Sequence, residues 1–322
     1  MTDVLILGGT GWLSGRIARR WVAQGARVTC LARGERAAPD GAVLVRGDRD
    51  DARTYDLLDR PWDEVVDISS RADHVRDAVD ALGDRAAHWT YISSVSVYAD
   101  ADVDGADETA RLEAPAQDGD EYDYAAQKVA AEEQVRTLGE RTHIIRPGLI
   151  VGAGDPSDRF GYWAAAFDRA GSEAVLVPRV AGRHVQVVEV DDLAAFATNI
   201  DLTGVHDAIG DPTPLDEVLD AFRTATGHGG DVRSASDDWL EAHGVQPWMG
   251  ERSLPLWLPA EYSGLTTRSN RAYRAAGGTQ TPWAPLIAQV LEDERARGLD
   301  RSRRAGLTRA DERALLAELA SG

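Results

Sequence analysis

The N-terminal sequence reads VLILGGTGWLSG over residues 4–15. Its apolar start is typical of a buried parallel strand, and a helical pattern follows the glycines. Gly8 permits a tight turn, and Gly11 lets the backbone approach a pyrophosphate at a helix N-terminus that offers free N–H groups. Ser14 stands in the third glycine position, where a small residue still fits. The sequence therefore predicts dinucleotide binding by Gly8, Thr10, Gly11, Trp12 and Leu13.

Strand and helix patterns alternate beyond this turn, which indicates a doubly wound parallel sheet of the Rossmann type. The fold class is thus α/β, with a smaller C-terminal substrate-binding part. We expect the dinucleotide-binding core to span 1–152 and 184–212, and the smaller part to span 153–183 and 213–322. The expected strands are 4–7, 28–31, 43–45, 65–68, 89–97, 144–151, 185–190 and 205–209.

The amino-acid composition of the chain argues against several classes of function. The 322 residues include 35 basic and 54 acidic side chains, a net charge of −19, and 43% of them are hydrophobic. Nucleic acids and anionic membranes need a basic face, so we expect neither as a partner, but a small-molecule substrate. One cysteine, Cys30, predicts neither a disulfide nor a metal site. We expect no secretory signal and a cytoplasmic protein; a homodimer stays open.

The second and third strands end in residues suited to the adenosine half of a dinucleotide. A carboxylate after the second strand would bind the ribose hydroxyl of NAD, but Arg33 stands there, with Arg36 behind it. A guanidinium suits a 2′-phosphate, which favours NADP and leaves NAD as the alternative. Asp48 is expected to accept a hydrogen bond from the adenine amino group, and Arg49 to stack on the ring.

Tyr124 and Lys128 are four residues apart in a helical stretch, so their side chains share one face. The 35 basic residues include a single lysine, and it is Lys128. A phenol is a weak acid near neutral pH, and a neighbouring ammonium favours the phenolate. This pairing predicts that Tyr124 is a catalytic acid/base and that Lys128 lowers its pKa.

Serines mark the C-terminal end of the fifth strand, in Ile92-Ser93-Ser94-Val95-Ser96-Val97-Tyr98. Ligands bind at this end of strands in an open parallel sheet. A hydroxyl here would hold a substrate carbonyl oxygen while Tyr124 transfers a proton. The residues alone leave the choice of serine open.

With these motifs the chain resembles the extended short-chain dehydrogenase/reductase family, also called the NAD-dependent epimerase/dehydratase family. The resemblance rests on the glycine turn, Ser94 with Val97-Tyr98, Tyr124 to Lys128, Arg146-Pro147-Gly148 and Val190 to Leu193. It implies that Ser94 is the catalytic serine, that Lys128 binds the nicotinamide ribose, and that Pro147 and Gly148 lie along the nicotinamide.

Departures from the family pattern bear on the substrate. Leu149 and Val185 stand where family members that act on nucleotide sugars carry asparagine and arginine. Residues 100–123 hold ten acids and one base, Arg111, and would repel anions if they rimmed the site. These points predict an NAD(P)H-dependent carbonyl reductase or dehydrogenase of a non-nucleotide small molecule. The alternatives are a nucleotide-sugar epimerase or dehydratase with tightly bound NAD, and a non-catalytic dinucleotide-sensing or RNA-binding protein.

Overall fold

A computed structural model describes residues 1–321. Within them, seven strands form one parallel sheet in the order β11-β6-β5-β4-β1-β2-β3. This confirms the predicted Rossmann-type fold class. The strands are β1 (Asp3–Leu7), β2 (Arg27–Ala32), β3 (Val43–Arg46), β4 (Trp62–Asp67), β5 (Ala86–Ile92), β6 (Thr142–Pro147) and β11 (Gly204–Ala208).

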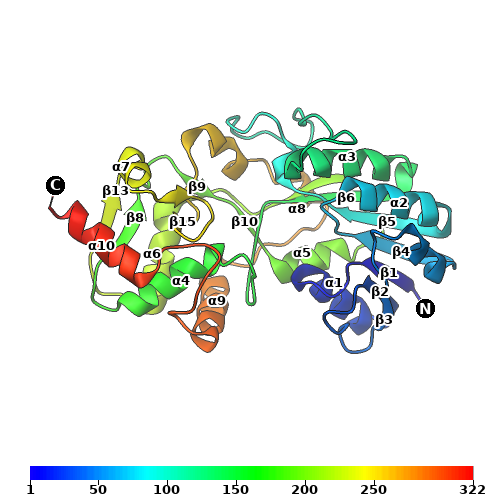
Figure 1. Cartoon of the computed structure of the whole chain (residues 1–322), viewed down its shortest axis with the longest axis horizontal. Coiled ribbons are helices and arrows are strands. Elements are labelled where there is room, and N and C mark those ends of the chain that lie inside the picture. Colours follow the sequence, from blue (N-terminus) through cyan, green and yellow to red (C-terminus); the bar gives the residue numbers. More distant parts are fainter. Residues whose placement is uncertain (322) are drawn as a thin grey trace.

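The central strands are apolar because helices cover them on both sides. Ile6 of β1 lies between Cys30 of β2 and Val66 of β4, and all three side chains are fully buried. Helices α1 (Trp12–Ala23) and α5 (Val190–Ala197) pack against each other on one face. Helices α2 (Ala72–Leu82) and α3 (Tyr124–Arg136) cover the other face (Figure 1).

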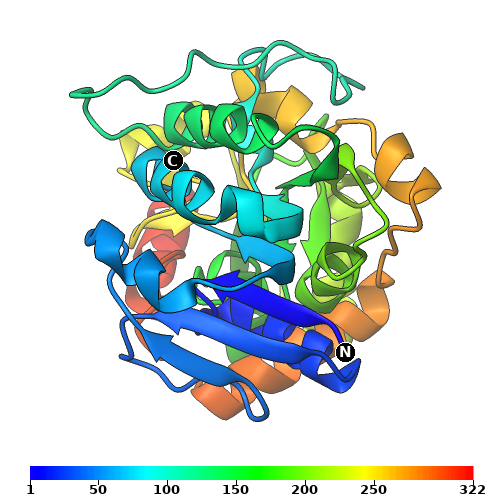
Figure 2. The ribbon, with the colours of Figure 1, turned by 90° about the vertical axis from the view of Figure 1, so that its right-hand side faces the viewer.

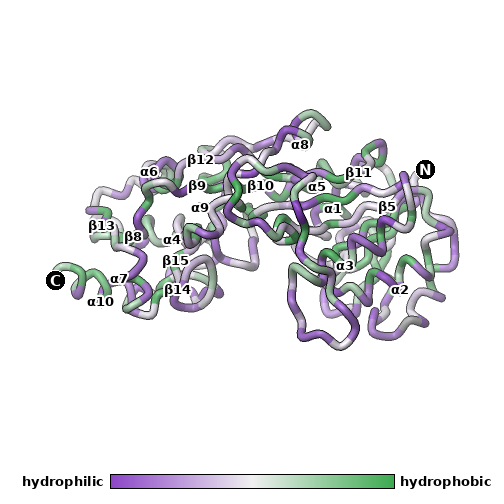
Figure 3. The backbone as a smooth tube through the Cα atoms, turned by 90° about the horizontal axis from the view of Figure 1, so that it is seen from above, coloured by the Kyte–Doolittle hydropathy of each residue, from purple (hydrophilic) through white to green (hydrophobic). Residues whose placement is uncertain are grey.

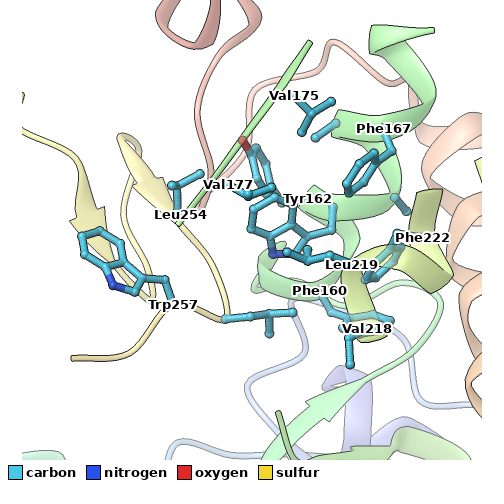
Figure 4. Close-up of a cluster of buried hydrophobic side chains, with 14 of the residues drawn as sticks. Phe160, Tyr162, Phe167, Val175, Val177, Val218, Leu219, Phe222, Leu254 and Trp257 are labelled. Atoms are coloured by element: carbon cyan, nitrogen blue, oxygen red, sulfur yellow. The ribbon is translucent and has the colours of Figure 1, made fainter. Parts of the chain in front are cut away.

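A second lobe is built around its own hydrophobic core. Helix α4 (Arg159–Ala170) packs on α6 (Leu215–Thr226) and α9 (Trp283–Arg297), while α10 (Arg309–Leu319) packs on β8 (Val175–Pro178). Strand β13 (Val232–Ala235) pairs with β8 in parallel. Figure 4 shows side chains of this core between these elements, among them Phe160, Tyr162, Phe167, Leu219, Phe222 and Trp257.

Short elements connect the two lobes and complete the second. Strand β7 (Leu149–Val151) pairs with β10 (Val187–Glu189), β9 (His184–Val185) with β12 (Thr213–Pro214), and β14 (Gln246–Pro247) with β15 (Ser253–Leu254). Helices α7 (Asp237–Ala242) and α8 (Arg271–Ala275) are also short. Helix α8, which lies in the range 213–322 expected for the smaller part, contacts β11 of the main sheet.

Three expected strands differ from the prediction. The strand expected over 185–190 is divided into β9 and β10, and Val190 already belongs to α5. The fifth ends at Ile92, because Ser94 caps a 3-10 turn over Val95–Val97 by accepting a hydrogen bond from the Ser96 N–H. The sixth breaks after Pro147, and β7 then leaves the main sheet to pair with β10. Both breaks lie at the carboxyl edge of the sheet, where they turn the chain toward the second lobe.

The acidic segment 99–123 forms a long loop along α3 (Figure 2). Its backbone is attached at both ends: the Gly105 N–H donates to the Thr267 carbonyl, and the Ala116 N–H donates to the Ala126 carbonyl. Along α2, hydrophobic and hydrophilic residues alternate, as expected for a helix with one buried face (Figure 3). No helix within residues 1–321 is long and apolar enough to span a membrane.

Candidate active site

The glycine turn between β1 and α1 has the conformation that its glycines allow. Gly8 lies in the left-handed region with φ +89°, where a side chain would be strained. A Cβ on Gly9 would lie 2.5 Å from the Cys30 Sγ, so this position permits the close approach of the turn to β2. Helix α1 begins at Trp12, and its first N–H groups have no intrahelical acceptor. They are available to a phosphate.

Two hydrogen bonds of Ser14 account for a serine in the third glycine position. Its hydroxyl donates to the Gly8 carbonyl oxygen over 2.6 Å and accepts a hydrogen bond from the Gly11 N–H over 2.9 Å. The side chain therefore braces the turn from inside, while the Trp12 indole fixes the helix start by donating to the Ala153 carbonyl over 2.9 Å.

A cavity of about 710 Å³ opens between this turn and the ends of β1, β2 and β4. Its size and its glycine-rich wall fit a dinucleotide. The residues predicted to bind the cofactor that line it are Gly8, Thr10, Gly11, Trp12, Leu13, Arg33, Asp48 and Arg49. Pro147 and Gly148 lie outside this wall; a Cβ on Gly148 would be 2.8 Å from Ile209, so close packing requires a glycine there.

Arg33 and Arg49 differ sharply in their surroundings. The Arg33 side chain is 65% exposed and lies 3.3 Å from the carboxylate of Glu35, a surface pair that leaves the guanidinium accessible. Arg49 instead forms two hydrogen bonds of 2.8 Å to the buried carboxylate of Asp67. This pairing holds the guanidinium of Arg49, which lines the cavity with Asp48, and its stacking on an adenine ring stays a prediction.

Tyr124 begins α3, and Asp123 caps the helix by accepting a hydrogen bond from the Ala126 N–H. Tyr124 is 42% exposed. Partial burial raises its pKa above the usual value of 10, while interaction with the Ser94 side chain and the charge of Arg159 act in the opposite direction. The two groups predicted for catalysis, Ser94 and Tyr124, are thus brought together by β5 and α3.

Lys128 lies one turn further along α3 and is almost fully buried. Its Nζ donates to the carbonyl oxygens of Ser69 and Ile92, at 2.8 and 2.6 Å. Burial lowers its pKa to about 7, although the charges of Asp67 and Glu132 act to raise it. Ser69 lines the cavity, so the ammonium is beside the cofactor space. The positive charge that lowers the pKa of Tyr124 is that of Arg159.

The other serines of the motif have local partners. Ser93 is buried and donates to the Glu132 carboxylate over 2.6 Å. Glu132 also accepts two hydrogen bonds from the buried Arg146. Ser96 receives a hydrogen bond from the Ser94 hydroxyl over 3.1 Å. Of the three, Ser94 is the serine that contacts Tyr124.

A second buried hydrogen-bond network holds Tyr98. The Tyr98 hydroxyl donates to Asp207 over 2.6 Å, and Asp207 accepts from Arg268 over 2.9 Å. The Arg268 guanidinium lies 3.3 Å from the centre of the Tyr98 ring. These contacts hold both the hydroxyl and the ring of Tyr98, which assigns Tyr98 to positioning the loop after β5.

The sequence left two residues of the second lobe unassigned to the site, Arg159 and Trp248. The Arg159 guanidinium lies 4.9 Å from the centre of the Trp248 ring, and its charge acts on Tyr124. Trp248 is half-buried. Tyr162, Trp163 and Trp257 are instead fully buried core residues. A helix start after Asp158 is readable in the sequence, but its nearness to Tyr124 is not.

Comparisons with known proteins show what this chain is similar to. No family model matches the chain. The chain is 28% identical over 277 residues to dTDP-6-deoxy-L-talose 4-dehydrogenase (NAD(P)(+)) of Kitasatospora kifunensis, which covers 78% of this chain and 82% of that relative.

Solved structures share the fold. The UDP-Glc/GlcNAc 4-epimerase of Campylobacter jejuni has a TM-score of 0.68 at 13% identity, covering 92% of this chain and 100% of that one. The Thermus thermophilus UDP-glucose 4-epimerase in complex with NAD has a TM-score of 0.64 at 18% identity, with coverage of 92% and 100%. The chain is thus similar in sequence to an NAD(P)-dependent sugar dehydrogenase and in fold to the epimerases, which agrees with the resemblance to the extended short-chain dehydrogenase/reductase family and with an oxidoreductase.

Proposed function

We propose that this enzyme oxidises or reduces a sugar carbon of a nucleotide-linked sugar, with Tyr124 as the acid/base. The observation that carries the proposal is the position of Lys128, one turn after Tyr124 on α3, whose Nζ donates to the carbonyl of Ser69 in the wall of the cavity of about 710 Å³. The relative that acts on a dTDP-sugar, and the epimerases that share the fold, support a nucleotide sugar as the substrate. This replaces the non-nucleotide carbonyl compound favoured by the sequence.

The two residues that favoured a non-nucleotide substrate have a packing explanation. Leu149 and Val185 are 5% and 2% exposed and belong to the hydrophobic core of the second lobe. Because neither side chain faces open space, their apolar character reflects packing and says nothing against a nucleotide. A diphosphate would then be bound by other residues of this chain.

The mechanism follows from the residues at the site. A dinucleotide held by the residues that line the cavity, among them Gly11 and Arg33, would supply hydride transfer at the reacting carbon. In the oxidative direction, Tyr124 takes the proton of the substrate hydroxyl, and Ser94 holds the same oxygen with a hydrogen bond. In the reductive direction, the phenol returns the proton. Lys128 holds the strand ends that form the floor of the nicotinamide-ribose site through its bonds to Ser69 and Ile92.

NADP(H) is the cofactor we propose. Arg33 lines the cavity and keeps an accessible guanidinium, because its pair with Glu35 is exposed on both sides. Such pairs contribute little, ~0–1 kcal/mol, and a 2′-phosphate offers a stronger charge-assisted partner.

The test is a turnover screen on the purified enzyme. dTDP- and UDP-sugars are offered with NADP⁺ and NAD⁺, and 4-keto sugars with the reduced cofactors, while absorbance at ~340 nm is followed. Net production of reduced cofactor from a nucleotide sugar supports a dehydrogenase. Sugar interconversion without net reduction, on nucleotide retained through purification, supports an epimerase. Turnover of simple ketones alone would overturn the proposal.

A further inference from the structure

Arg159 is held rigidly at the edge of the second lobe that faces Tyr124. It is the first residue of α4. Its Nε donates to the Ser157 hydroxyl oxygen over 3.2 Å, and that hydroxyl donates to the buried carboxylate of Asp155 over 2.8 Å. Trp248 covers one side of the guanidinium, 4.9 Å from its ring centre. One hydrogen bond and one aromatic face therefore fix the orientation of the guanidinium.

The outer end of this guanidinium has no partner. Within residues 1–321, neither Nη of Arg159 takes part in a hydrogen bond or an ion pair. Other shielded arginines are paired: Arg146 with Glu132, and Arg268 with Asp207. Burial lowers the pKa of Arg159, with Asp155 as the nearest opposing charge. The free donors of the two Nη groups are therefore available to an anion.

The backbone conformation is unusual at the residue before Arg159 and at Trp248. Asp158 and Trp248 have φ of 62° and 66°, in the left-handed region that residues other than glycine seldom adopt. Asp158 is held there because its carboxylate accepts hydrogen bonds from the Arg304 N–H at 2.9 Å and from Arg301. Such strain is retained where surrounding contacts enforce it, and it often marks functional positions.

We infer that the two Nη groups of Arg159 bind an oxyanion of the substrate and so determine which end of the substrate faces Tyr124. The guanidinium fork matches two oxygens of a phosphate or a carboxylate. This inference rests on the proposed function for the source of the anion, which in a nucleotide sugar is the diphosphate. A carboxylate on a smaller substrate has the same chemistry, and the experiment separates the two.

Binding is measured by calorimetry on the enzyme saturated with NADP⁺, so that the cofactor's own phosphate site is filled. The probes are inorganic pyrophosphate, UDP and malonate. We expect wild type to bind pyrophosphate and UDP, and Arg159→Gln to bind them about 10- to 150-fold more weakly, as for loss of one charge-assisted contact. Tighter binding of malonate than of UDP would assign the anion to a carboxylate.

Two further variants separate a binding role from a structural one. Arg159→Lys keeps the charge without the fork, so binding should fall less than in Arg159→Gln. Arg233→Gln is the matched control, because Arg233 is an exposed arginine of the same lobe paired only with Asp231. If Arg159→Gln fails to fold, phenylglyoxal labelling of wild type decides: pyrophosphate should protect the peptide that contains Arg159.

Equal anion affinity in wild type and a folded Arg159→Gln overturns the inference, and so does labelling of Arg159 that pyrophosphate leaves unchanged. The proposed function fails separately. If no nucleotide sugar is turned over while anion binding still depends on Arg159, the substrate class is wrong and the subsite stands. Tyr124→Phe should abolish turnover and leave pyrophosphate affinity as in wild type.

Discussion

Lys128 donates a hydrogen bond from Nζ to the main-chain carbonyl oxygen of Ile92 over 2.6 Å. With its second bond, to Ser69, the ammonium joins helix α3 to the ends of two neighbouring strands. The lone lysine of the chain is therefore both a support for the floor of the site and a group beside the cofactor cavity. A thin amine fits between two carbonyl groups where a planar guanidinium does not.

Replacing this lysine should lower stability as well as turnover. In Lys128→Met the carbonyl oxygen of Ile92 loses its Nζ donor, and that of Ser69 keeps only the hydrogen bond from the Tyr91 hydroxyl. An unsatisfied buried group costs ~1–3 kcal/mol. Urea unfolding measures the loss. Glu133→Met, on the exposed face of the same helix, is the control and should change the midpoint little. Equal midpoints for Lys128→Met and wild type would contradict the supporting role.

The same lysine predicts a pH dependence of stability. Burial lowers its pKa to about 7 from 10.5, while Asp67 and Glu132 partly offset this and Arg49 adds to it. Between these values the unfolded chain binds more protons, so the free energy of unfolding should rise with pH. The slope is at most ~1.4 kcal/mol per pH unit for one group. Urea titrations at pH 7 to 9.5 should show this slope in wild type but not in Lys128→Met; parallel curves would refute it.

Tyr124→Phe tests the acid/base directly. The variant keeps the ring and removes the transferable proton, so turnover should fall ~10²–10⁴-fold with little change in cofactor affinity. Ser94→Ala should lower turnover too, because the substrate oxygen and the phenol both lose a hydrogen-bond partner. Ser96→Ala is the matched control. A Tyr124→Phe enzyme that keeps more than about a tenth of wild-type turnover would exclude this mechanism.

The fold and the core of the site were readable from local patterns. Short apolar strands, a glycine turn and the Tyr124–Lys128 spacing each depend on neighbours within a few residues, and the sheet that they predict is present. The limits of β5 were missed, because a capping hydroxyl at Ser94 stops a run that otherwise favours a strand.

The sequence did not predict which residues of the second lobe lie near the first lobe. Arg159 lies 35 residues after Tyr124 in the sequence and on another lobe, so only the folded chain brings its charge to the phenol. Leu149 and Val185 were interpreted as ligand positions that had lost their polar groups. Their side chains lie in a core that the sequence did not reveal.

Ser14→Ala should loosen the glycine turn. Without the hydroxyl, the Gly11 N–H loses its acceptor at 2.9 Å, and the Gly8 carbonyl keeps only its hydrogen bonds from the main-chain N–H groups of Thr10 and Gly11. We expect a loss of ~1–3 kcal/mol in the free energy of unfolding, and weaker NADP(H) binding because the turn is less ordered. Ser14→Gly gives the usual residue of the position and should bind cofactor better than Ser14→Ala. If wild type, Ser14→Ala and Ser14→Gly bind NADP(H) with equal affinity, the hydrogen bonds of Ser14 do not contribute to cofactor binding.

Arg33→Asp should reverse the cofactor preference. The carboxylate would repel a 2′-phosphate and could accept a hydrogen bond from the free ribose hydroxyl of NADH. Losing one charge-assisted contact costs about 1.5–3 kcal/mol, so NADPH affinity should fall ~10–150-fold while NADH affinity rises. Fluorescence titration with both nucleotides measures the change. Arg36→Asp is the comparison, because Arg36 lines the same cavity three residues away.

Because the Arg33–Glu35 pair is exposed, Glu35→Gln should free the guanidinium and strengthen NADPH binding slightly. A wild-type enzyme that prefers NADH would refute the assignment of the 2′-phosphate to Arg33.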